Sequence, residues 1–229
     1  SDLAMDLRGA GWSEVTPKGY EKEQFASDVL AAATVLGLDS FDLVGHDWGG
    51  WTAQLVALKA PARVTRLAIL NIPPVWQEPG RVARHAHKLA YQLVVGAPVV
   101  GPLSHLSPTL WWFIRRSGMP QESVDFFRSC FRDRDRRVAG SKIYRAMVGK
   151  AFAELPSGPY GDKTLAMQVP VLFGLDDVAV HPSLLDGFTD HADDLNITEV
   201  PNCGHFIIDE QPDLVIKWLS DVLAESRQS

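Results

Sequence analysis

The sequence is poor in cysteine and in positive charge. Cys130 and Cys203 are its only cysteines in 229 residues, so we expect free thiols rather than a disulfide framework. Its 22 Lys and Arg stand against 28 Asp and Glu, which gives a net charge of -6. With no basic surplus to neutralise phosphates, the composition argues against a nucleic acid partner.

Long hydrophobic runs are missing as well. The longest nearly uncharged apolar stretch, residues 89–103, is interrupted by two glycines and two prolines and is too short and broken to span a membrane. The first ten residues carry Asp2, Asp6 and Arg8, unlike a secretory signal peptide. We therefore expect a soluble, cytoplasmic protein with no membrane partner.

Apolar residues make up 46% of the chain, which is enough to bury a full core. Along the chain, segments with the apolar spacing of strands alternate with segments that have the spacing of helices. Residues 41–44 and 64–70 read as strands on either side of a helix at 51–60. Strands separated by helices predict a parallel sheet with right-handed crossovers, and hence an α/β fold. The same patterns predict helices at 21–36 and 213–225 and strands at 169–174 and 197–200.

The middle of the chain has a different pattern. Between Pro73 and Pro156 the sequence indicates helices broken by glycine and proline and rich in aromatic residues. We interpret residues 73–156 as a helical cap inserted into a core formed by residues 1–72 and 157–229.

The segment from Gly45 to Gly50, Gly-His-Asp-Trp-Gly-Gly, lies between a predicted strand and a predicted helix. A residue there, with glycines two before and two after it, can occupy a sharp turn that points its side chain out of the sheet at a helix N-terminus. Asp47 has this position. A carboxylate is ionised at neutral pH, so it needs no base to attack an electrophilic carbon and form an ester.

Two further polar signals follow later strands, where open α/β sheets place their sites. Asp176 and Asp177 come after residues 169–174, and His205 comes after the last predicted strand. The order along the chain is therefore nucleophile, acid, histidine, which is the order of the α/β-hydrolases.

These motifs resemble those of the epoxide hydrolase and haloalkane dehalogenase branch of the α/β-hydrolases. Residues 2–13 resemble the family's fourth strand and its D-x-R-G-x-G-x-S turn, residues 45–50 its nucleophile turn, and residues 203–206 its histidine loop. The resemblance implies an α/β-hydrolase fold, a mostly parallel sheet with an inserted helical cap, and no cofactor or metal.

The resemblance also implies the role of each site residue. Asp47 is expected to be the nucleophile and His205 the base. Asp177 is expected to orient His205, with Asp176 as the competing candidate. The backbone N–H of Trp48 is expected to stabilise the oxyanion.

The cap carries two tyrosines in motifs that resemble the lid motifs of epoxide hydrolases, Tyr91 in Ala-Tyr-Gln and Tyr144 in Ile-Tyr-Arg. A tyrosine hydroxyl is protonated at pH 7 and can donate to the oxygen of an epoxide ring. The leading hypothesis is thus an epoxide hydrolase that forms a vicinal diol, with water and an apolar or aromatic epoxide as its small-molecule partners. The alternatives are a haloalkane dehalogenase-type hydrolase with the same triad, or a catalytically silent scaffold that binds a ligand or a protein.

The family's fold places three strands, a helix and an HGxP loop, which supplies a second oxyanion donor, before the segment matched by residues 2–13. We therefore expect the chain to be part of a longer protein, lacking the N-terminal strands. The sequence leaves a homodimer open.

Overall fold

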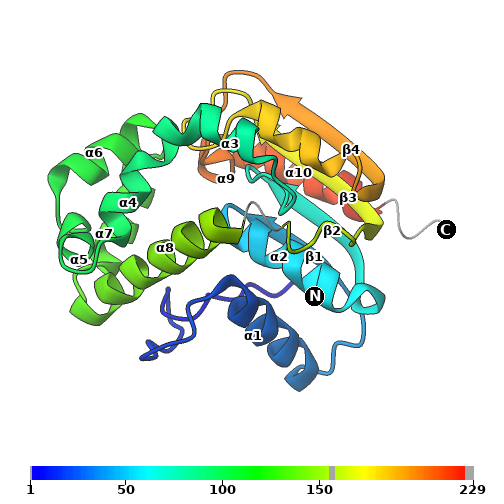
Figure 1. Cartoon of the computed structure of the whole chain (residues 1–229), viewed down its shortest axis with the longest axis horizontal. Coiled ribbons are helices and arrows are strands. Elements are labelled where there is room, and N and C mark those ends of the chain that lie inside the picture. Colours follow the sequence, from blue (N-terminus) through cyan, green and yellow to red (C-terminus); the bar gives the residue numbers. More distant parts are fainter. Residues whose placement is uncertain (1, 155–157, 225–229) are drawn as a thin grey trace.

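A four-stranded parallel sheet forms the centre of the protein, as the computed structural model shows for residues 2–154 and 158–224 (Figure 1). Its order is β1-β2-β3-β4, so each strand lies beside its predecessor in the chain. The bounds are β1 Phe41–His46, β2 Val64–Leu70, β3 Leu165–Gly174 and β4 Ala192–Val200. Parallel neighbours need a crossover between them, which is why the sheet is built from β-α-β units.

The two inner strands carry most of the sheet's core. β2 and β3 are nearly continuous apolar runs, and Ile69 and Val171, which are register partners, are both fully buried. This is the pattern of parallel strands covered on both faces. β1 and β4 form the edges of the sheet. β1 exposes alternate residues, including Val44 at 43%, and β4 exposes most of its residues.

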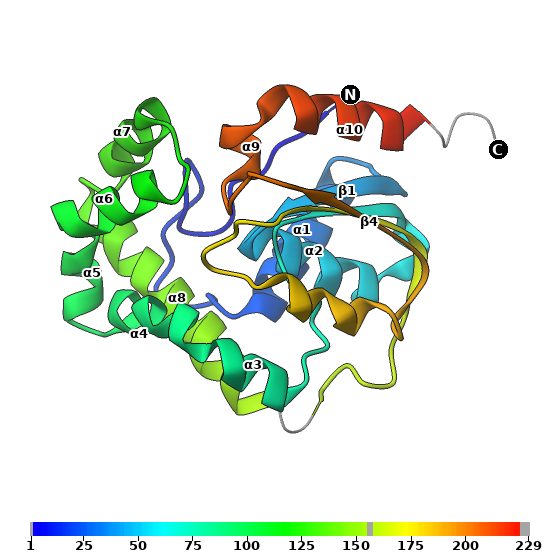
Figure 2. The same ribbon diagram turned by 90° about the horizontal axis from the view of Figure 1, so that it is seen from above.

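Helices cover both faces of the sheet (Figure 2). On one face lie α1 (Lys22–Val35) and α2 (Trp48–Lys59), with the 3-10 helices η1 (Pro61–Arg63) and η4 (Pro182–Phe188). On the other face lie α9 (Ile207–Glu210) and α10 (Pro212–Ala224), where Val215 packs against β2 and β3. The expected α/β class is thereby confirmed.

A group of helices lies beside the sheet, and in the sequence these helices come between β2 and β3 (Figure 1). These are α3 (Pro79–His85), η2 (Ala86–Leu89), α4 (Ala90–Gly96), α5 (Val100–Ser104), α6 (Pro108–Arg116), α7 (Gln121–Cys130) and α8 (Arg134–Glu154). We call this group the cap. The predicted boundary at residues 156 and 157 lies outside the described residues.

The resemblance predicts a strand at the start of the chain, and this prediction is wrong. Residues 2–7 form no strand, because no neighbouring strand offers them a hydrogen-bonded ladder, and Leu3 is 65% exposed. The turn expected after it is present: Ala10 N–H donates to the Leu7 carbonyl at 2.9 Å and Ser13 N–H to the Ala10 carbonyl at 3.0 Å.

Other boundaries shift by a few residues. α2 begins at Trp48 rather than residue 51, and β3 and β4 begin at Leu165 and Ala192, earlier than their apolar runs suggest. The early part of β4 is polar because it lies at the sheet's edge, where side chains face water.

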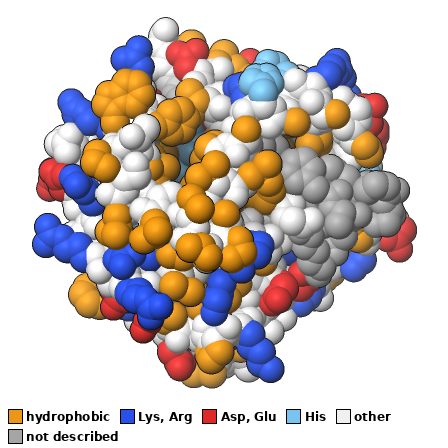
Figure 3. All heavy atoms as spheres, turned by 60° about the vertical axis from the view of Figure 1, so that its left-hand side comes forward, with side chains coloured by type: hydrophobic (Ala, Val, Ile, Leu, Met, Phe, Trp, Pro, Cys, Tyr) orange, Lys and Arg blue, Asp and Glu red, His pale blue; other side chains and the backbone are white. Residues whose placement is uncertain are grey.

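Both cysteines are free thiols, as expected. Within residues 2–154 and 158–224, no helix combines the length and the apolar character that crossing a bilayer requires. The cap side of the molecule exposes several apolar side chains with Lys and Arg around them (Figure 3), among them Val99 at 74% and Trp112 at 61%.

Candidate active site

Asp47 occupies a sharp turn where β1 ends and α2 begins. Its backbone has φ 49° and ψ -127°, a positive φ that non-glycine residues rarely adopt. Such conformations cost on the order of 1–3 kcal/mol and persist only where the surroundings enforce them. The turn places the Asp47 carboxylate at the N-terminus of α2, whose dipole favours negative charge.

Two glycines make this turn possible. A Cβ on Gly45 would lie 2.6 Å from the carbonyl oxygen of Gly49, and one on Gly50 would lie 2.6 Å from Cγ2 of Ile72. A Cβ on Gly49 would meet nothing within 4 Å. Gly50, three residues after Asp47, is therefore the second glycine that close packing requires, and Gly49 is not.

His205 faces Asp47 from the loop that follows β4. Its Nε2 lies 3.6 Å from Oδ1 of Asp47, and its Nδ1 lies 2.8 Å from Oδ2 of Asp177. The histidine is 6% exposed and the Asp177 side chain has no exposed surface. The structure thus brings together three residues that are far apart in the sequence, each placed at the carboxyl end of a strand.

The carboxylate that contacts the histidine is that of Asp177, whereas Asp176 is exposed to solvent. Oδ1 of Asp177 accepts from the backbone N–H groups of Ala179 at 2.7 Å and Val180 at 2.8 Å. Its Oδ2 accepts from Nδ2 of Asn71 at 2.9 Å in addition to His205. With both oxygens fixed in this way, the carboxylate can hold the imidazole in one orientation.

Asn71 belongs to this site and was missed in the sequence. It is fully buried, with φ 43°, directly after β2. Its Nδ2 also donates to the Gly204 carbonyl at 3.1 Å, and its Oδ1 accepts from the N–H of Gly174 at 3.2 Å. A polar residue immediately after a buried apolar strand was the signal that could have identified it.

The histidine loop is held from several sides. His46 Nε2 lies 2.7 Å from the carbonyl oxygen of His205, so His46 supports the loop rather than facing the substrate side. Glu210 accepts from the backbone N–H of Gly204 at 2.8 Å and of Phe206 at 3.0 Å. From the cap, Lys88 donates to the backbone carbonyl of Asp177 at 2.8 Å.

The charges at the site shift its pKa values. Burial lowers the pKa of His205, but the hydrogen bonds and charges of Asp177 and Asp47 outweigh burial and raise that pKa to about 10. Burial raises the pKa of Asp47, but contact with His205, the charge of His46 and the backbone N–H of Trp48 lower it overall. The two carboxyl groups that flank His205 therefore favour the protonated form of its imidazole.

Tyr91 on α4 and Tyr144 on α8 lie next to each other, with ring centroids 6.5 Å apart. The two helices pack closely, since Nε of Arg145 donates to the Gly96 carbonyl at 2.8 Å. Burial raises the pKa of Tyr91 to about 12, with a contribution from the charge of Asp47. Burial likewise raises the pKa of Tyr144, helped by Tyr91 and by Asp47. Both hydroxyls thus stay protonated near the carboxylate.

Trp48 contributes in two ways. Its backbone N–H interacts with the Asp47 carboxylate, and its ring packs edge-on against that of Tyr144, with centroids 6.2 Å apart. The first residue of α2 therefore connects the turn to the cap.

A cavity of about 130 Å³ is lined by Asp47 and Trp48 and by further residues of both the core and the cap. Neither Tyr91 nor Tyr144 is among the described residues that line it. Its wall is mainly apolar. Besides Asp47, the described residues that bring a polar group to it are Lys22, Gln77, Gln92 and Tyr160. The described apolar lining comprises Trp48, Trp51, Ile72, Pro73, Val75, Trp76, Val82, Val148, Pro159, Ala179, Val180 and Leu184.

In the part of the chain that the structure describes, no three His, Cys, Asp or Glu side chains cluster as a metal ion would require. The arrangement offers a carboxylate on a strained turn that lines an apolar cavity, an oriented histidine beside it, and two protonated tyrosines close enough for its charge to raise their pKa values. Such a set can form a covalent ester and hydrolyse it.

Comparison with known proteins gives matches along the whole chain. A family model described as "alpha/beta hydrolase fold" matches residues 3–212. A fluoroacetate dehalogenase from Burkholderia sp. is 28% identical over 98% of this chain and 79% of its own length. A soluble epoxide hydrolase from Corynebacterium sp. (strain C12) is 42% identical over 31% of this chain and 25% of its own length.

Solved structures give the same picture. The epoxide hydrolase CorEH superposes with a TM-score of 0.79 at 24% identity, over 96% of this chain and 80% of that one. Cfl2 from Burkholderia cenocepacia superposes with a TM-score of 0.77 at 25% identity, over 95% of this chain and 76% of that one. These likenesses support the same fold for this chain.

Proposed function

The chain belongs to the α/β-hydrolase fold family, in its epoxide hydrolase and dehalogenase branch, and from this premise we propose that it is an epoxide hydrolase. The proposed reaction converts an epoxide to a vicinal diol. The observation that carries the proposal is the position of Asp47, with His205 at 3.6 Å and two cap tyrosines whose pKa its charge raises.

In the first step, a carboxylate oxygen of Asp47 attacks one carbon of the epoxide. A carbon–oxygen bond forms, the bond between that carbon and the ring oxygen breaks, and the ring oxygen takes a proton from Tyr91 or Tyr144. The high tyrosine pKa values suit this role, because the hydroxyls are fully protonated donors at neutral pH. The product is an ester between Asp47 and the opened substrate.

In the second step, water hydrolyses that ester. Ester formation removes the negative charge of Asp47, which is one of the causes that raise the pKa of His205. The pKa of His205 therefore falls once the ester exists, and the neutral imidazole, held by Asp177, takes a proton from water. The hydroxide attacks the ester carbonyl and the Trp48 N–H stabilises the oxyanion. Collapse breaks the bond between the carbonyl carbon and the substrate oxygen, which takes the proton of the regenerated carboxyl group, so the diol leaves and the Asp47 carboxylate is restored. The proton that His205 gave up before the attack restores the tyrosine hydroxyl.

The test is to incubate the His205→Gln variant with an epoxide and weigh the intact protein. Attack by Asp47 should proceed while hydrolysis stalls, so the protein mass should rise by the mass of one epoxide, with the label on Asp47 after proteolysis. The Asp47→Ala, His205→Gln double variant is the control and should stay unlabelled. If the single variant also stays unlabelled with a broad set of epoxides, the proposal fails.

A dehalogenase is the second candidate, because the fluoroacetate dehalogenase match extends over 98% of the chain. The same triad would displace a halide instead of opening a ring. Halide release from haloalkanes or haloacids, with no diol formed from epoxides, would favour this function over the first.

A further inference from the structure

The outer side of the cap exposes large apolar side chains on three neighbouring helices. Eight of them are between 38% and 74% exposed, and they come from α4, α5, α6 and the residues that join these helices: Leu93, Val94, Val99, Val100, Leu103, Leu106, Trp112 and Phe113. We call these eight residues the apolar cap face. Apolar side chains left in water on adjacent elements mark a surface that binds a partner.

Contacts between the helices make this face one surface. α4 packs against α5, and the ring of Tyr91 on α4 lies 5.9 Å from the ring of Phe113 on α6. Nε1 of Trp111 donates to the His105 carbonyl at 2.8 Å, which ties α6 to the end of α5. Figure 3 shows apolar side chains gathered on the cap side of the molecule. The three short helices therefore present their exposed apolar residues together.

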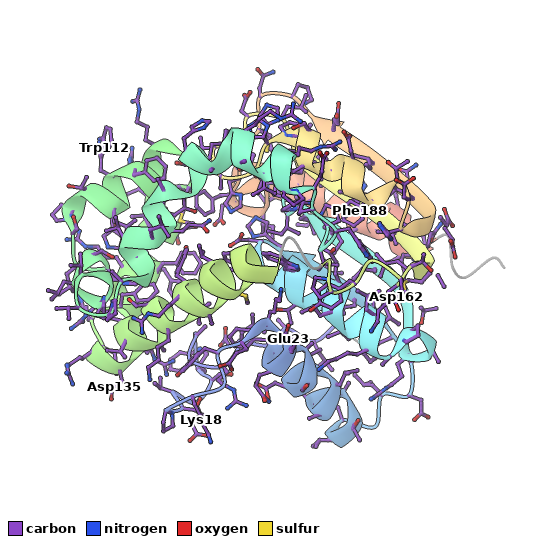
Figure 4. All side chains as sticks on the ribbon, in the orientation of Figure 1. Lys18, Glu23, Trp112, Asp135, Asp162 and Phe188 are labelled. Carbon is purple, nitrogen blue, oxygen red and sulfur yellow. The ribbon has the colours of Figure 1, made fainter. Side chains whose placement is uncertain are left out.

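The apolar cap face lies at one end of the molecule. In Figures 1 and 2 the helices α5 and α6 lie at the side of the cap that is remote from the sheet. Figure 4 labels Trp112 on this outer side. A flat partner can therefore reach the apolar cap face without contacting the sheet.

The charge around this face has a single sign. Residues 79–121, which contain the whole face, carry five Lys and Arg and no Asp or Glu, although the chain has a net charge of -6. Arg115 and Arg116 are exposed on α6, and the guanidinium carbon of Arg116 lies 5.7 Å from the ring centroid of Trp112. Arg145 on α8 is exposed as well and donates to the last residue of α4. Positive charge therefore accompanies the exposed apolar residues.

This combination matches the surface of a bilayer that contains anionic lipids. Apolar side chains can enter the boundary between headgroups and acyl chains, an indole ring favours that depth, and arginines pair with lipid phosphates. A second copy of the chain matches less well, because a two-fold contact through this face would place its arginines beside those of the other copy. The acidic remainder of the chain opposes binding little, because the Debye length is about 10 Å at 0.1 M salt.

We infer that the apolar cap face docks on the surface of a membrane that contains anionic lipids. The lack of a long apolar run in the sequence argues against a spanning segment, but not against this contact, because the tertiary structure assembles the face from short helices. Since Phe113 packs against Tyr91, the docked surface lies one ring away from a cap residue of the candidate active site. The inference goes beyond the proposed function and does not depend on it.

Binding is measured by co-sedimentation with vesicles of phosphatidylcholine alone, or of phosphatidylcholine and phosphatidylglycerol in equal amounts. The wild type should bind the anionic vesicles about tenfold or more tightly, since each arginine near an anionic surface contributes about fivefold. Added salt should weaken this binding. No binding to the anionic vesicles, or equal binding to both kinds, would overturn the inference.

Variants at exposed positions test the two parts of the face. Trp112→Ser should weaken binding to the anionic vesicles about tenfold, and the double variant Arg115→Gln, Arg116→Gln should weaken it about tenfold or more. Trp12→Ser and Lys217→Gln are the matched controls, because Trp12 is 93% exposed and the Lys217 side chain 77% exposed outside the cap. Both controls should bind as the wild type does. Equal losses in variants and controls, or a loss in the arginine variant alone, would contradict docking through the apolar cap face.

Fluorescence quenching by brominated phosphatidylcholine in the anionic vesicles then locates the contact. Trp112→Phe keeps an aromatic ring, and its fluorescence should be quenched less than that of the wild type, whereas Trp12→Phe should be quenched as much. Equal quenching in the wild type and Trp112→Phe would overturn the inference even if Trp112→Ser fails to fold.

Two further outcomes would assign the face to another partner. A wild-type dimer in sedimentation velocity that Trp112→Ser dissociates, without vesicle binding, would show a contact between copies of the chain. Polyglutamate bound as tightly as the anionic vesicles, with the same loss in Trp112→Ser, would point to an acidic protein. Either result would overturn the membrane contact. None of these measurements involves turnover, so each outcome leaves the epoxide hydrolase proposal to its own test.

Discussion

The sheet and the cap supply different parts of the site in different ways. Asp47, Asp177 and His205 follow the carboxyl ends of strands, and backbone N–H groups, Asn71 and Glu210 fix the turns that carry them. Tyr91 and Tyr144 come from helices held together mainly by side-chain packing. Hydrogen bonds therefore fix the three residues at the sheet, whereas the position of the two tyrosines depends on how the cap helices pack.

Charge separates the two regions as well. The cap helices and the segments between them, residues 79–154, have 13 Lys and Arg against 5 Asp and Glu, whereas the remaining residues have 9 against 23. Asp47 and Asp177 thus belong to the acidic part of the molecule, and the cap beside them is basic. Lys88 joins the two regions through the backbone carbonyl of Asp177.

The largest expected effect lies in the sheet. Asp177→Asn should lower kcat about 10⁴-fold, because the amide cannot hold the His205 tautomer that accepts a proton from water. Steady-state kinetics on an epoxide measure this loss. Asp176→Asn is the matched control and should stay within about twofold of the wild type, because Asp176 is exposed. Similar losses of kcat in both variants would contradict the assignment of Asp177 as the residue that orients His205.

The next effect lies in the cap. Tyr144→Phe removes a protonated donor near Asp47 and should slow epoxide opening by about 10²-fold or more while leaving halide displacement nearly unchanged. Tyr20→Phe is its control, since it removes a buried hydroxyl that bonds only the Thr16 carbonyl at 2.7 Å. An equal loss in both variants would point to stability rather than chemistry.

A smaller effect is expected on stability. Asn71→Ala removes one hydrogen-bond donor from the Asp177 carboxylate and the side-chain partner of the Gly204 carbonyl and the Gly174 N–H, so the free energy of unfolding should fall by about 2 kcal/mol or more. Urea denaturation gives this value. Asn202→Ala shares the positive φ (54°) but is exposed, so it should cost only the backbone strain. If the free energy of unfolding falls by the same amount in both variants, the buried network around Asn71 contributes nothing to stability.

The smallest effect is a dependence of stability on pH. The pKa of His205 is raised from 6.5 to about 10, so the stability that its protonated form provides is present in full below pH 6.5 and is lost as the pH rises toward 10. The Tm of the wild type should fall by several degrees from pH 7 to 10, and that of His205→Gln should fall less. Parallel curves for the two proteins would refute this account.

Most of the strands, and the site positions at their ends, were predictable because short stretches of sequence indicate them. β2 and β3 are apolar runs, and the Gly-rich turn around Asp47 follows a strand signal, so element type and order were confirmed. The strand expected before Gly9 was wrong because a strand exists only beside a neighbour, which local sequence does not specify. Asn71 was missed because its partners, Asp177 and Gly204, are more than 100 residues away in the chain.

By itself the sequence determined the α/β class, the family and the three residues in the order Asp47, Asp177, His205, because residue type and spacing carry this information. Only the tertiary structure decided that Asp177 rather than Asp176 contacts His205, that Asn71 joins them, and that Lys22 lines the cavity of Asp47. Burial and hydrogen bonding depend on which segments, distant in the sequence, come into contact. In this protein, the packing of the sheet against α1 and the cap determines those contacts.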